Sequence, residues 1–159
     1  MIYRSWNYDD ILTVAEMEKR CFSEESWTFQ MFASSFEQPG FFCELCEAEY
    51  DGQKKLAAYG CVQCVEDTAD LMTIAVAPEY RGRGLGRVML RRLVGGARRR
   101  GAKKLFLEVR VSNDVAKRLY LNEGFERISV RKKYYPDGED AFVMNKRLPI
   151  AAAEGAEKP

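Results

Sequence analysis

A glycine-rich segment is the sharpest chemical signal in this sequence. It reads Arg81-Gly82-Arg83-Gly84-Leu85-Gly86, and it lies between the apolar stretch TIAVA and a run with helical periodicity. Backbone amides at the start of a helix carry partial positive charge, and glycines let an anion approach them closely. The segment therefore predicts a site for a pyrophosphate. The alternative is a merely tight turn between a strand and a helix.

Single residues exclude two common nucleotide-binding motifs at this segment. A P-loop requires Gly-Lys followed by Ser or Thr, and the chain has no such tripeptide. A dinucleotide-binding fingerprint that starts at Gly82 and Gly84 requires a third glycine at position 87, where the chain has Arg87. Any phosphate at this loop is therefore bound through a different pattern.

The chain contains no histidine, and this absence limits its chemistry. It excludes Ser-His-Asp and Cys-His nucleophilic sites, His-ligated zinc, and acid–base catalysis by an imidazole. Proton transfer must then use a glutamate, aspartate, tyrosine, lysine or cysteine.

The cysteines offer a competing hypothesis, a zinc-stabilised binding module. Cys43 and Cys46 form one CxxC pair, and Cys61 and Cys64 form a second, which is a spacing typical of zinc sites. Neither pair encloses a Gly or Pro, and both lie in stretches that we expect to be strands. On a strand, residues three apart point to opposite faces. We therefore favour small buried side chains and predict no metal site.

Composition predicts one ordinary domain. The chain has 159 residues, 47% of them hydrophobic and 31% charged, and its 25 Lys and Arg nearly balance its 24 Asp and Glu. We expect a single domain over residues 1–148 and a flexible tail over 149–159. The first residues lack the features of a signal peptide, and no apolar run approaches the ~20 residues that span a bilayer. We therefore expect a cytoplasmic monomer with no nucleic acid or membrane partner.

The first half of the chain predicts two helices and four strands. After a short strand over 1–6, periodicity indicates a helix over 7–20, capped by Asn7 or Asp9. A second helix extends from Ser26, its expected cap, to about Phe36. The stretches FFCELCEAEY and KKLAAYGCVQCV follow, and the Asp51-Gly52 turn between them indicates a hairpin. The next strand, DLMTIAVAP, is apolar on both faces, as expected of a central strand.

The second half alternates helices and strands. A helix runs from the glycine-rich loop to about Arg100 and ends at Gly101. We expect strand LFLEVRV next, then a helix capped by Ser112-Asn113-Asp114, and finally strands FERISVRKKYY and DAFVMNKRL. The order of elements predicts a mixed α/β domain. The residues expected on the packing face of the helix after the loop are Leu85, Val88, Met89, Leu93 and Gly96.

The segment VAPEYRGRGLG resembles motif A of the GCN5-related N-acetyltransferases, in which Arg81, Gly84 and Gly86 match the family pattern. LEVRVSNDVAKRLYLNEGF and KKYYPDGEDAFVM are similar to the bacterial ribosomal-protein alanine N-acetyltransferases, which acetylate the N-terminal alanine of a small-subunit ribosomal protein. The likeness is dense from about residue 70 to 148 and thinner over 10–37. There, Ser26 and Thr28 flank Trp27 where the family usually has Pro-Trp-Ser.

The resemblance implies a fold and a cofactor. The fold is a mixed, mostly antiparallel sheet of six or seven strands with helices on both faces, in which two central parallel strands splay apart. Acetyl-CoA enters the splay, where strand backbone contacts the pantetheine and the loop wraps the pyrophosphate. The residues that the resemblance assigns to acetyl-CoA are Ile74, Ala75, Val76, Arg81, Gly82, Arg83, Gly84, Leu85, Gly86, Arg87 and Asn113.

The resemblance also implies the catalytic residues, each with a plainer alternative. Glu108 matches the family's general base, and alternatively forms an ion pair with Arg110 or another basic group. Tyr120 matches the general acid, and alternatively is a core aromatic. Without histidine or metal, a backbone N–H near Val76 is the candidate donor to the developing oxyanion.

The acceptor follows from the same resemblance. It implies a protein N-terminus, that of a small-subunit ribosomal protein, as the acceptor of the acetyl group. A small-molecule amine or a protein lysine is the alternative acceptor. The residues expected on the peptide-binding side are Trp27, Tyr134 and Tyr135, of which the two tyrosines could equally pack within a strand.

Overall fold

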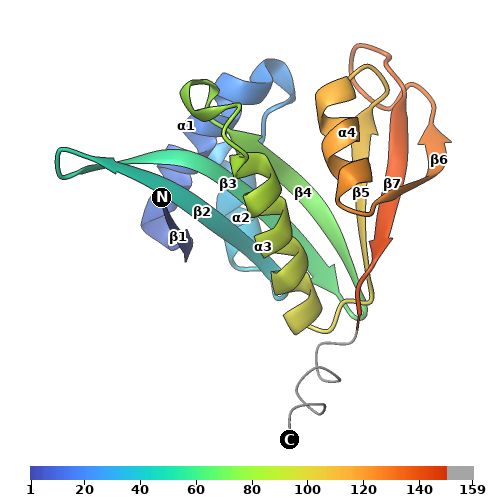
Figure 1. Cartoon of the computed structure of the whole chain (residues 1–159), viewed down its shortest axis with the longest axis horizontal. Helices are drawn as coiled ribbons and strands as arrows, with labels where there is room; N and C mark the ends of the chain where they lie inside the picture. The colour runs from blue at the N-terminus through green and yellow to red at the C-terminus, as the bar shows by residue number, and fades with distance from the viewer. Residues whose placement is uncertain (150–159) are drawn as a thin grey trace, which may run out of the picture. The chain divides into compact units, whose positions relative to one another are not determined.

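The computed structural model describes residues 1–149, so the predicted tail lies outside the described residues except for Pro149. The strands form one sheet in the order β1-β2-β3-β4-β5-β7-β6 (Figure 1). The strands are β1 (Ile2–Ser5), β2 (Phe41–Tyr50), β3 (Gln53–Val65), β4 (Thr68–Val76), β5 (Lys104–Arg110), β6 (Glu126–Arg131) and β7 (Ala141–Arg147), and the α-helices are α1 (Ile11–Phe22), α2 (Phe29–Phe36), α3 (Leu85–Arg99) and α4 (Asp114–Asn122).

The sheet is mostly antiparallel and contains one parallel pair, which confirms the predicted fold class. That pair joins Thr68–Asp70 of β4 to Lys104–Phe106 of β5, the first residues of both strands. Both strands continue beyond the ladder, β4 to Val76 and β5 to Arg110.

The chain forms two compact units. Unit 1 comprises Met1–Gln63 and Met72–Leu93, and unit 2 comprises Cys64–Leu71 and the chain from Val94 onward. The prediction of a single domain over 1–148 stays a prediction. The boundary between the units passes through β4 and through α3, so each of these elements contributes to both units. The loop between β4 and α3 belongs to unit 1, and β5, α4, β6 and β7 belong to unit 2.

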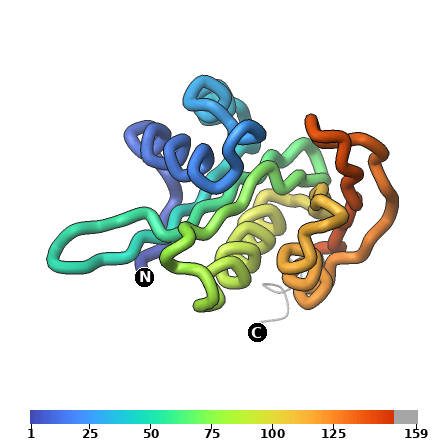
Figure 2. The backbone as a smooth tube through the Cα atoms, turned by 90° about the horizontal axis from the view of Figure 1, so that it is seen from above, coloured from blue at the N-terminus to red at the C-terminus, as the bar shows by residue number. Residues whose placement is uncertain are grey.

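Helices cover both faces of the strands in unit 1. Figure 1 shows α1 and α2 behind β2 and β3 with the start of α3 in front, and Figure 2 shows the same layers from above. Gly60 of β3 lies against α3, because a Cβ added there would come within 2.3 Å of Leu93 Cδ1. The buried cluster that α1 and α2 form with the sheet comprises Ile11, Val14, Met17, Phe32, Cys43, Leu45, Tyr59, Cys61, Ala75 and Ala77.

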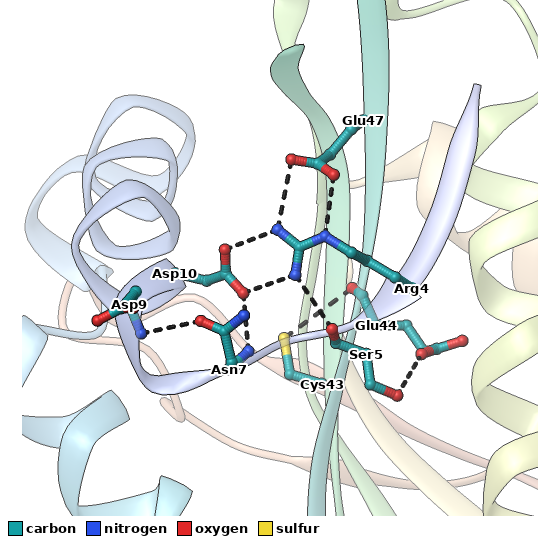
Figure 3. A network of polar contacts seen from close by, with 8 residues as sticks. All are labelled: Arg4, Ser5, Asn7, Asp9, Asp10, Cys43, Glu44 and Glu47. Atoms are coloured by element: carbon teal, nitrogen blue, oxygen red, sulfur yellow. Dashed lines mark hydrogen bonds and ion pairs between the residues drawn. The ribbon is translucent and has the colours of Figure 1, made fainter.

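An arginine on β1 fixes the start of α1 to the sheet. The Arg4 guanidinium donates to both Asp10 oxygens at 2.7 and 2.8 Å, and its Nε donates to Glu47 of β2 at 2.9 Å (Figure 3). Asp10 also accepts the Asn7 backbone N–H, while the Asn7 side chain accepts from Asp9 N. The predicted cap Asn7 is therefore confirmed, at a short 3₁₀ turn that leads into α1.

Two predictions about helix details are wrong. The cap of α2 is Thr28, which accepts from Met31 N, whereas the predicted cap Ser26 donates to Ser23 O within the preceding 3₁₀ turn. On α3, Val88 is 39% exposed, and Leu90 and Ala97 are buried instead. The buried stripe drifts by about 40° every four residues of a 3.6-residue helix, and the drift carries it away from Val88.

In unit 2, β7 pairs antiparallel with both β5 and β6. Asn113 caps α4 by accepting from Ala116 N at 3.1 Å, as predicted. β6 ends at Arg131, so Tyr134 and Tyr135 lie in the connection to β7 and not in the predicted strand. These tyrosines are therefore not strand-packing aromatics.

The four CxxC cysteines are buried side chains, as the preferred interpretation predicts. Cys43 and Cys61 are cross-strand partners on β2 and β3, and Cys46 lies opposite Tyr3 of β1. Burial raises the pKa of the Cys46, Cys61 and Cys64 thiols. Within residues 1–149, no group of three or more His, Cys, Asp or Glu side chains could hold a metal ion. None of the helices in this range is long and apolar enough to cross a membrane.

Candidate functional site

The glycine-rich loop of unit 1 connects the end of β4 to the start of α3. Gly82 and Gly84 have φ values of +77° and +80°, a conformation that side chains with a Cβ rarely adopt. A Cβ added to Gly82 would meet no atom within 4 Å, so its backbone is open to a ligand. The first amides of α3 have no partner within the helix, and they point out of its N-terminus. The loop therefore fits the predicted site for a diphosphate.

The Arg81 side chain turns back toward β4. Its Nε donates to the Val76 carbonyl at 2.9 Å, and its Nη2 lies 3.7 Å from Cys21 Sγ of α1. Arg81 thus ties the loop to the strand end and to α1. The Arg83 guanidinium lies over the Tyr80 ring, 5.4 Å from its centroid. Unit 1 therefore brings together Ile74–Val76 and Arg81–Arg87, the two segments assigned to the cofactor.

Trp27 lies in the extended segment between α1 and α2. Its ring contacts Phe32, with centroids 5.3 Å apart, and stacks on Phe41 at 6.1 Å. The same residue lines a shallow pocket of about 370 Å³ along α2, with Gln30, Met31, Ser34 and Ser35. Trp27 therefore packs on one side against core aromatics and lines this pocket on the other.

Glu108 projects from β5 in unit 2 and forms an ion pair. Its Oε1 lies 3.3 Å from Arg131 Nε of β6, whereas Arg110 pairs with Asp137 and Glu139. Of the alternatives left open by the sequence, the basic partner is thus Arg131. Because both side chains are partly exposed, the pair contributes only about 0–1 kcal/mol to stability. Glu108 remains reachable as a proton acceptor.

Tyr120 is buried on α4, and its ring contacts Phe125 edge-on at 5.7 Å. Burial raises the pKa of Tyr120, and the neighbouring Tyr135 raises it further. A hydroxyl with a raised pKa stays protonated at neutral pH, as a proton donor must. Its position is compatible with both predicted interpretations, a core aromatic and a general acid.

The two tyrosines of the β6–β7 connection lie near the predicted catalytic residues. Their rings contact each other edge-on, with centroids 5.0 Å apart. Burial raises the pKa of Tyr135 to about 12, and the Glu108 charge contributes to that shift. Burial also raises the pKa of Tyr134, again with a contribution from Glu108. Electrostatic coupling therefore links Glu108, Tyr134, Tyr135 and, through Tyr135, Tyr120.

Arg110 holds the connection that carries these tyrosines. It donates to Asp137 at 2.8 Å and to Glu139 at 2.7 Å, and its guanidinium lies 4.1 Å from the Tyr135 ring centroid. Glu139 also accepts the Ser112 N–H at 2.8 Å, next to the α4 cap Asn113. Asn113, assigned to the cofactor by resemblance, uses its side-chain oxygen to cap α4.

Sequence reasoning missed Arg131 and Glu139. Arg131 and Arg110 both lie opposite Ala141, and Glu108 lies opposite Val143, so β7 sets their relative positions. A register shift between Arg127 and Ser129 decides which residues of β6 share the face of Glu108. No local pattern in the sequence encodes that shift. For Glu139, the sequence did hold a signal: the charged segment DGED leads directly into an expected strand.

Comparisons with known proteins agree with this geometry. The model of the acetyltransferase (GNAT) family matches residues 11–125. The ribosomal protein bS18-alanine N-acetyltransferase of Escherichia coli (strain K12) is 46% identical over 100 residues, which are 61% of this chain and 66% of that protein. A relative of Bacillus subtilis (strain 168), given the same name provisionally, is 40% identical over 129 residues, covering 73% of this chain and 84% of that one.

A solved structure gives the same result for the fold. The crystal structure of the ribosomal-protein-S18-alanine N-acetyltransferase from Escherichia coli has a TM-score of 0.82 and 35% identity, and the match covers 94% of this chain and 95% of that chain. The family match, the sheet with its single parallel pair and the glycine-rich loop agree: this chain belongs to the GNAT family of acetyltransferases.

Proposed function

We propose that this protein transfers the acetyl group of acetyl-CoA to the N-terminal amine of a ribosomal protein that begins with alanine. The observation that carries the proposal is the identity of 40–46% to relatives named for this activity. The first of these matches covers 61% of this chain and 66% of the relative. The identity of the acceptor is therefore part of the proposal.

Unit 1 would hold acetyl-CoA. The open backbone at Gly82 and Gly84 and the first amides of α3 would hold the diphosphate, and strand residues Ile74–Val76 would contact the pantetheine. When bound, acetyl-CoA supplies an acetyl group activated as a thioester. The Val76 backbone N–H is the candidate donor to the oxygen on which charge develops.

Unit 2 would supply the proton transfers. Glu108 accepts a proton from the amine, directly or through a water, and Arg131 orients the Glu108 carboxylate. Tyr120 keeps its proton because burial raises its pKa, and gives it to the departing thiolate. No covalent enzyme intermediate and no cysteine nucleophile are required.

An N-terminal amine suits a base of this kind. A free α-amine has a pKa near 7.7–8.0 against about 10.4 for lysine, a difference of ~2.5 units or ~3.4 kcal/mol. A partly exposed carboxylate such as Glu108 therefore deprotonates an α-amine at a much smaller free-energy cost than a lysine. This difference favours an N-terminus over a lysine as the acceptor.

Peptide mass spectrometry tests the proposal. The protein is incubated with acetyl-CoA and a library of hexapeptides that vary in the first residue, beside a polyamine and an N-terminally blocked peptide containing lysine. We expect acetylation to be confined to free N-termini and to be fastest on alanine. Acetylation of the polyamine or of the blocked peptide, with none on free N-termini, would overturn the proposed acceptor.

A further inference from the structure

A buried carboxylate in unit 1 has no part in the proposed proton transfers. Glu18 lies on α1 and is only 2% exposed, beside the apolar cluster under α1 and α2. Removing a carboxylate from water costs several kcal/mol unless hydrogen bonds replace its hydration. The burial of Glu18 is therefore costly unless hydrogen bonds within the protein offset it.

Three neutral donors satisfy this carboxylate. Oε1 accepts a hydrogen bond from the Tyr59 hydroxyl of β3 and a second from Thr73 Oγ1 of β4 at 2.7 Å. Oε2 accepts the backbone N–H of Trp27 at 2.8 Å. A single side chain thus joins α1, two neighbouring strands and the segment that leads into α2.

Two of these hydrogen bonds, those from Thr73 and Trp27, involve segments that adjoin the proposed reaction site. Thr73 directly precedes Ile74–Val76, the strand residues proposed to contact the acyl-pantetheine. At the end of α1, Cys21 Sγ lies 3.9 Å from the Val76 carbonyl, so the chain leaves α1 beside the end of β4. The next residues, Phe22–Trp27, return to Glu18 through the Trp27 N–H. The carboxylate therefore fixes this segment to the same strand.

Packing alone does not require a carboxylate here. An apolar side chain of similar size, with Phe in place of Tyr59 and Val in place of Thr73, would avoid the cost of burying a charge. Only the Trp27 N–H would then lose its partner. The distinctive contribution of Glu18 is therefore the tie between Trp27 and β4.

We propose that Glu18 is a positioning residue for the acceptor: it holds Phe22–Trp27 at a fixed distance from β4, and this segment forms one wall of the peptide-binding site. The inference rests on the proposed function. It predicts that loss of the tie weakens binding of the acceptor peptide and leaves binding of acetyl-CoA intact.

The test uses variants that separate the tie from stability. The apolar triple variant Glu18→Met/Tyr59→Phe/Thr73→Val removes the charge together with the two hydroxyls that it satisfies. Glu18→Gln is the conservative control, because its carbonyl can accept the Trp27 N–H while its NH₂ donates to the two hydroxyls. Thermal unfolding, kcat, and KM for an alanine-starting peptide and for acetyl-CoA are measured for each.

We expect the triple variant to unfold within a few degrees of the wild type and to show a peptide KM raised about tenfold, the factor for ~1.4 kcal/mol of binding. Its KM for acetyl-CoA should stay within about twofold of the wild-type value, and Glu18→Gln should keep a near-normal peptide KM. A stable triple variant with an unchanged peptide KM, or with equal rises in both KM values, would overturn the proposal.

A second measurement does not depend on turnover or on the triple variant. Thr73→Val has nearly the same shape as the wild-type side chain and removes only the bond to β4. Hydrogen exchange of the Trp27 amide should then be about tenfold faster than in the wild type, while exchange in the core of α1 is unchanged. Unchanged exchange at Trp27 would contradict the tie. If the wild type acetylates no peptide, the proposed function fails and this arm still tests the tie.

Discussion

Glu108 and Tyr120 are held in different ways, and the difference sets what their substitution should do. Glu108 pairs with the partly exposed Arg131, whereas Tyr120 is buried with its ring against Phe125. Removing the Glu108 charge should leave the fold intact, and removing the Tyr120 hydroxyl leaves the ring and its packing in place. Both residues can therefore be tested without loss of the folded state.

We predict that Glu108→Gln and Tyr120→Phe each lower kcat by about 10²-fold or more, the usual loss when a positioned acid or base is removed. Acetyl-CoA affinity, measured by calorimetry, should change little. Tyr50→Phe, at the exposed turn of the β2–β3 hairpin, is the matched control and should keep wild-type kcat. Near-normal turnover in both site variants would remove these residues from the mechanism.

Glu139 gives a residue-level prediction with a defined sign. The Ser112 N–H and the Arg110 guanidinium lower the pKa of Glu139 to about 2 from its ordinary 4.5. A carboxylate whose pKa is lowered by folding stabilises the folded state at pH values above its pKa in the unfolded chain. This stabilisation is lost as the pH falls toward the pKa in the folded protein.

Glu139→Gln should therefore unfold at a lower temperature than the wild type at pH 7, and the gap should close between about pH 4.5 and 2. Thermal unfolding across this range checks the result. Glu126→Gln reports the general effect of removing a negative charge from the same unit. A gap that persists in full at pH 2 would show that the Glu139 charge is not the cause.

At the scale of elements, the turns and caps with local chemistry were predictable. Asp51 and Gly52 both have positive φ, which is what a two-residue hairpin turn requires, and the dipeptide itself predicts the turn. The cap at Asn113 follows from its place before a helical run. Thr28 was missed because Ser26 is an equally good cap type nearby, and a tertiary bond of Trp27 to Glu18 decides where α2 begins.

The functional site likewise has parts that the sequence predicts and parts that it does not. The glycine-rich loop was recognisable because its function resides in the backbone and in contiguous residues. The partners of Glu108, Glu18 and Arg110 were not recognisable, because they come from other elements or connecting segments of the chain. Sheet register and helix packing bring these partners together, and neither leaves a local pattern in the sequence.

The loop supports a prediction with a closely matched control. Gly82→Ala forces a Cβ onto a residue with φ +77°, and Gly52→Ala does the same at φ +73°, each with no atom within 4 Å. Both should destabilise the fold by a similar amount, about 1–2 kcal/mol. Only Gly82→Ala should also weaken acetyl-CoA binding, by calorimetry. Equal affinity in the two variants would argue against diphosphate binding at the loop.

At the scale of the whole molecule, the titrating groups predict a flat stability profile around neutrality. The chain has no histidine, the side chain whose ordinary pKa lies between about pH 5 and 8. In acid, hydrogen bonds lower the pKa of Asp10, Asp137 and Asp140, and their stabilisation is lost as the pH falls below about 4. Asp70, whose pKa burial raises, opposes this trend in part.

In base, the buried thiols limit stability. Burial raises the pKa of Cys46, Cys61 and Cys64 above 9.0, so the folded state loses stability once the pH exceeds the value at which unfolded thiols ionise. We therefore expect an unfolding midpoint that is constant from about pH 5 to 8 and falls on either side. A steep slope within that interval, measured by calorimetry, would contradict this account.

The uneven burial of the five cysteines makes the protein easy to label. Cys43, Cys46, Cys61 and Cys64 are enclosed, whereas Cys21 is half-exposed at the end of α1, within reach of Arg81 and the Val76 carbonyl. A mild alkylating dye should therefore attach at one position of the native chain. That position adjoins the last residue of β4, so its emission can report ligand arrival in real time without any engineered reporter.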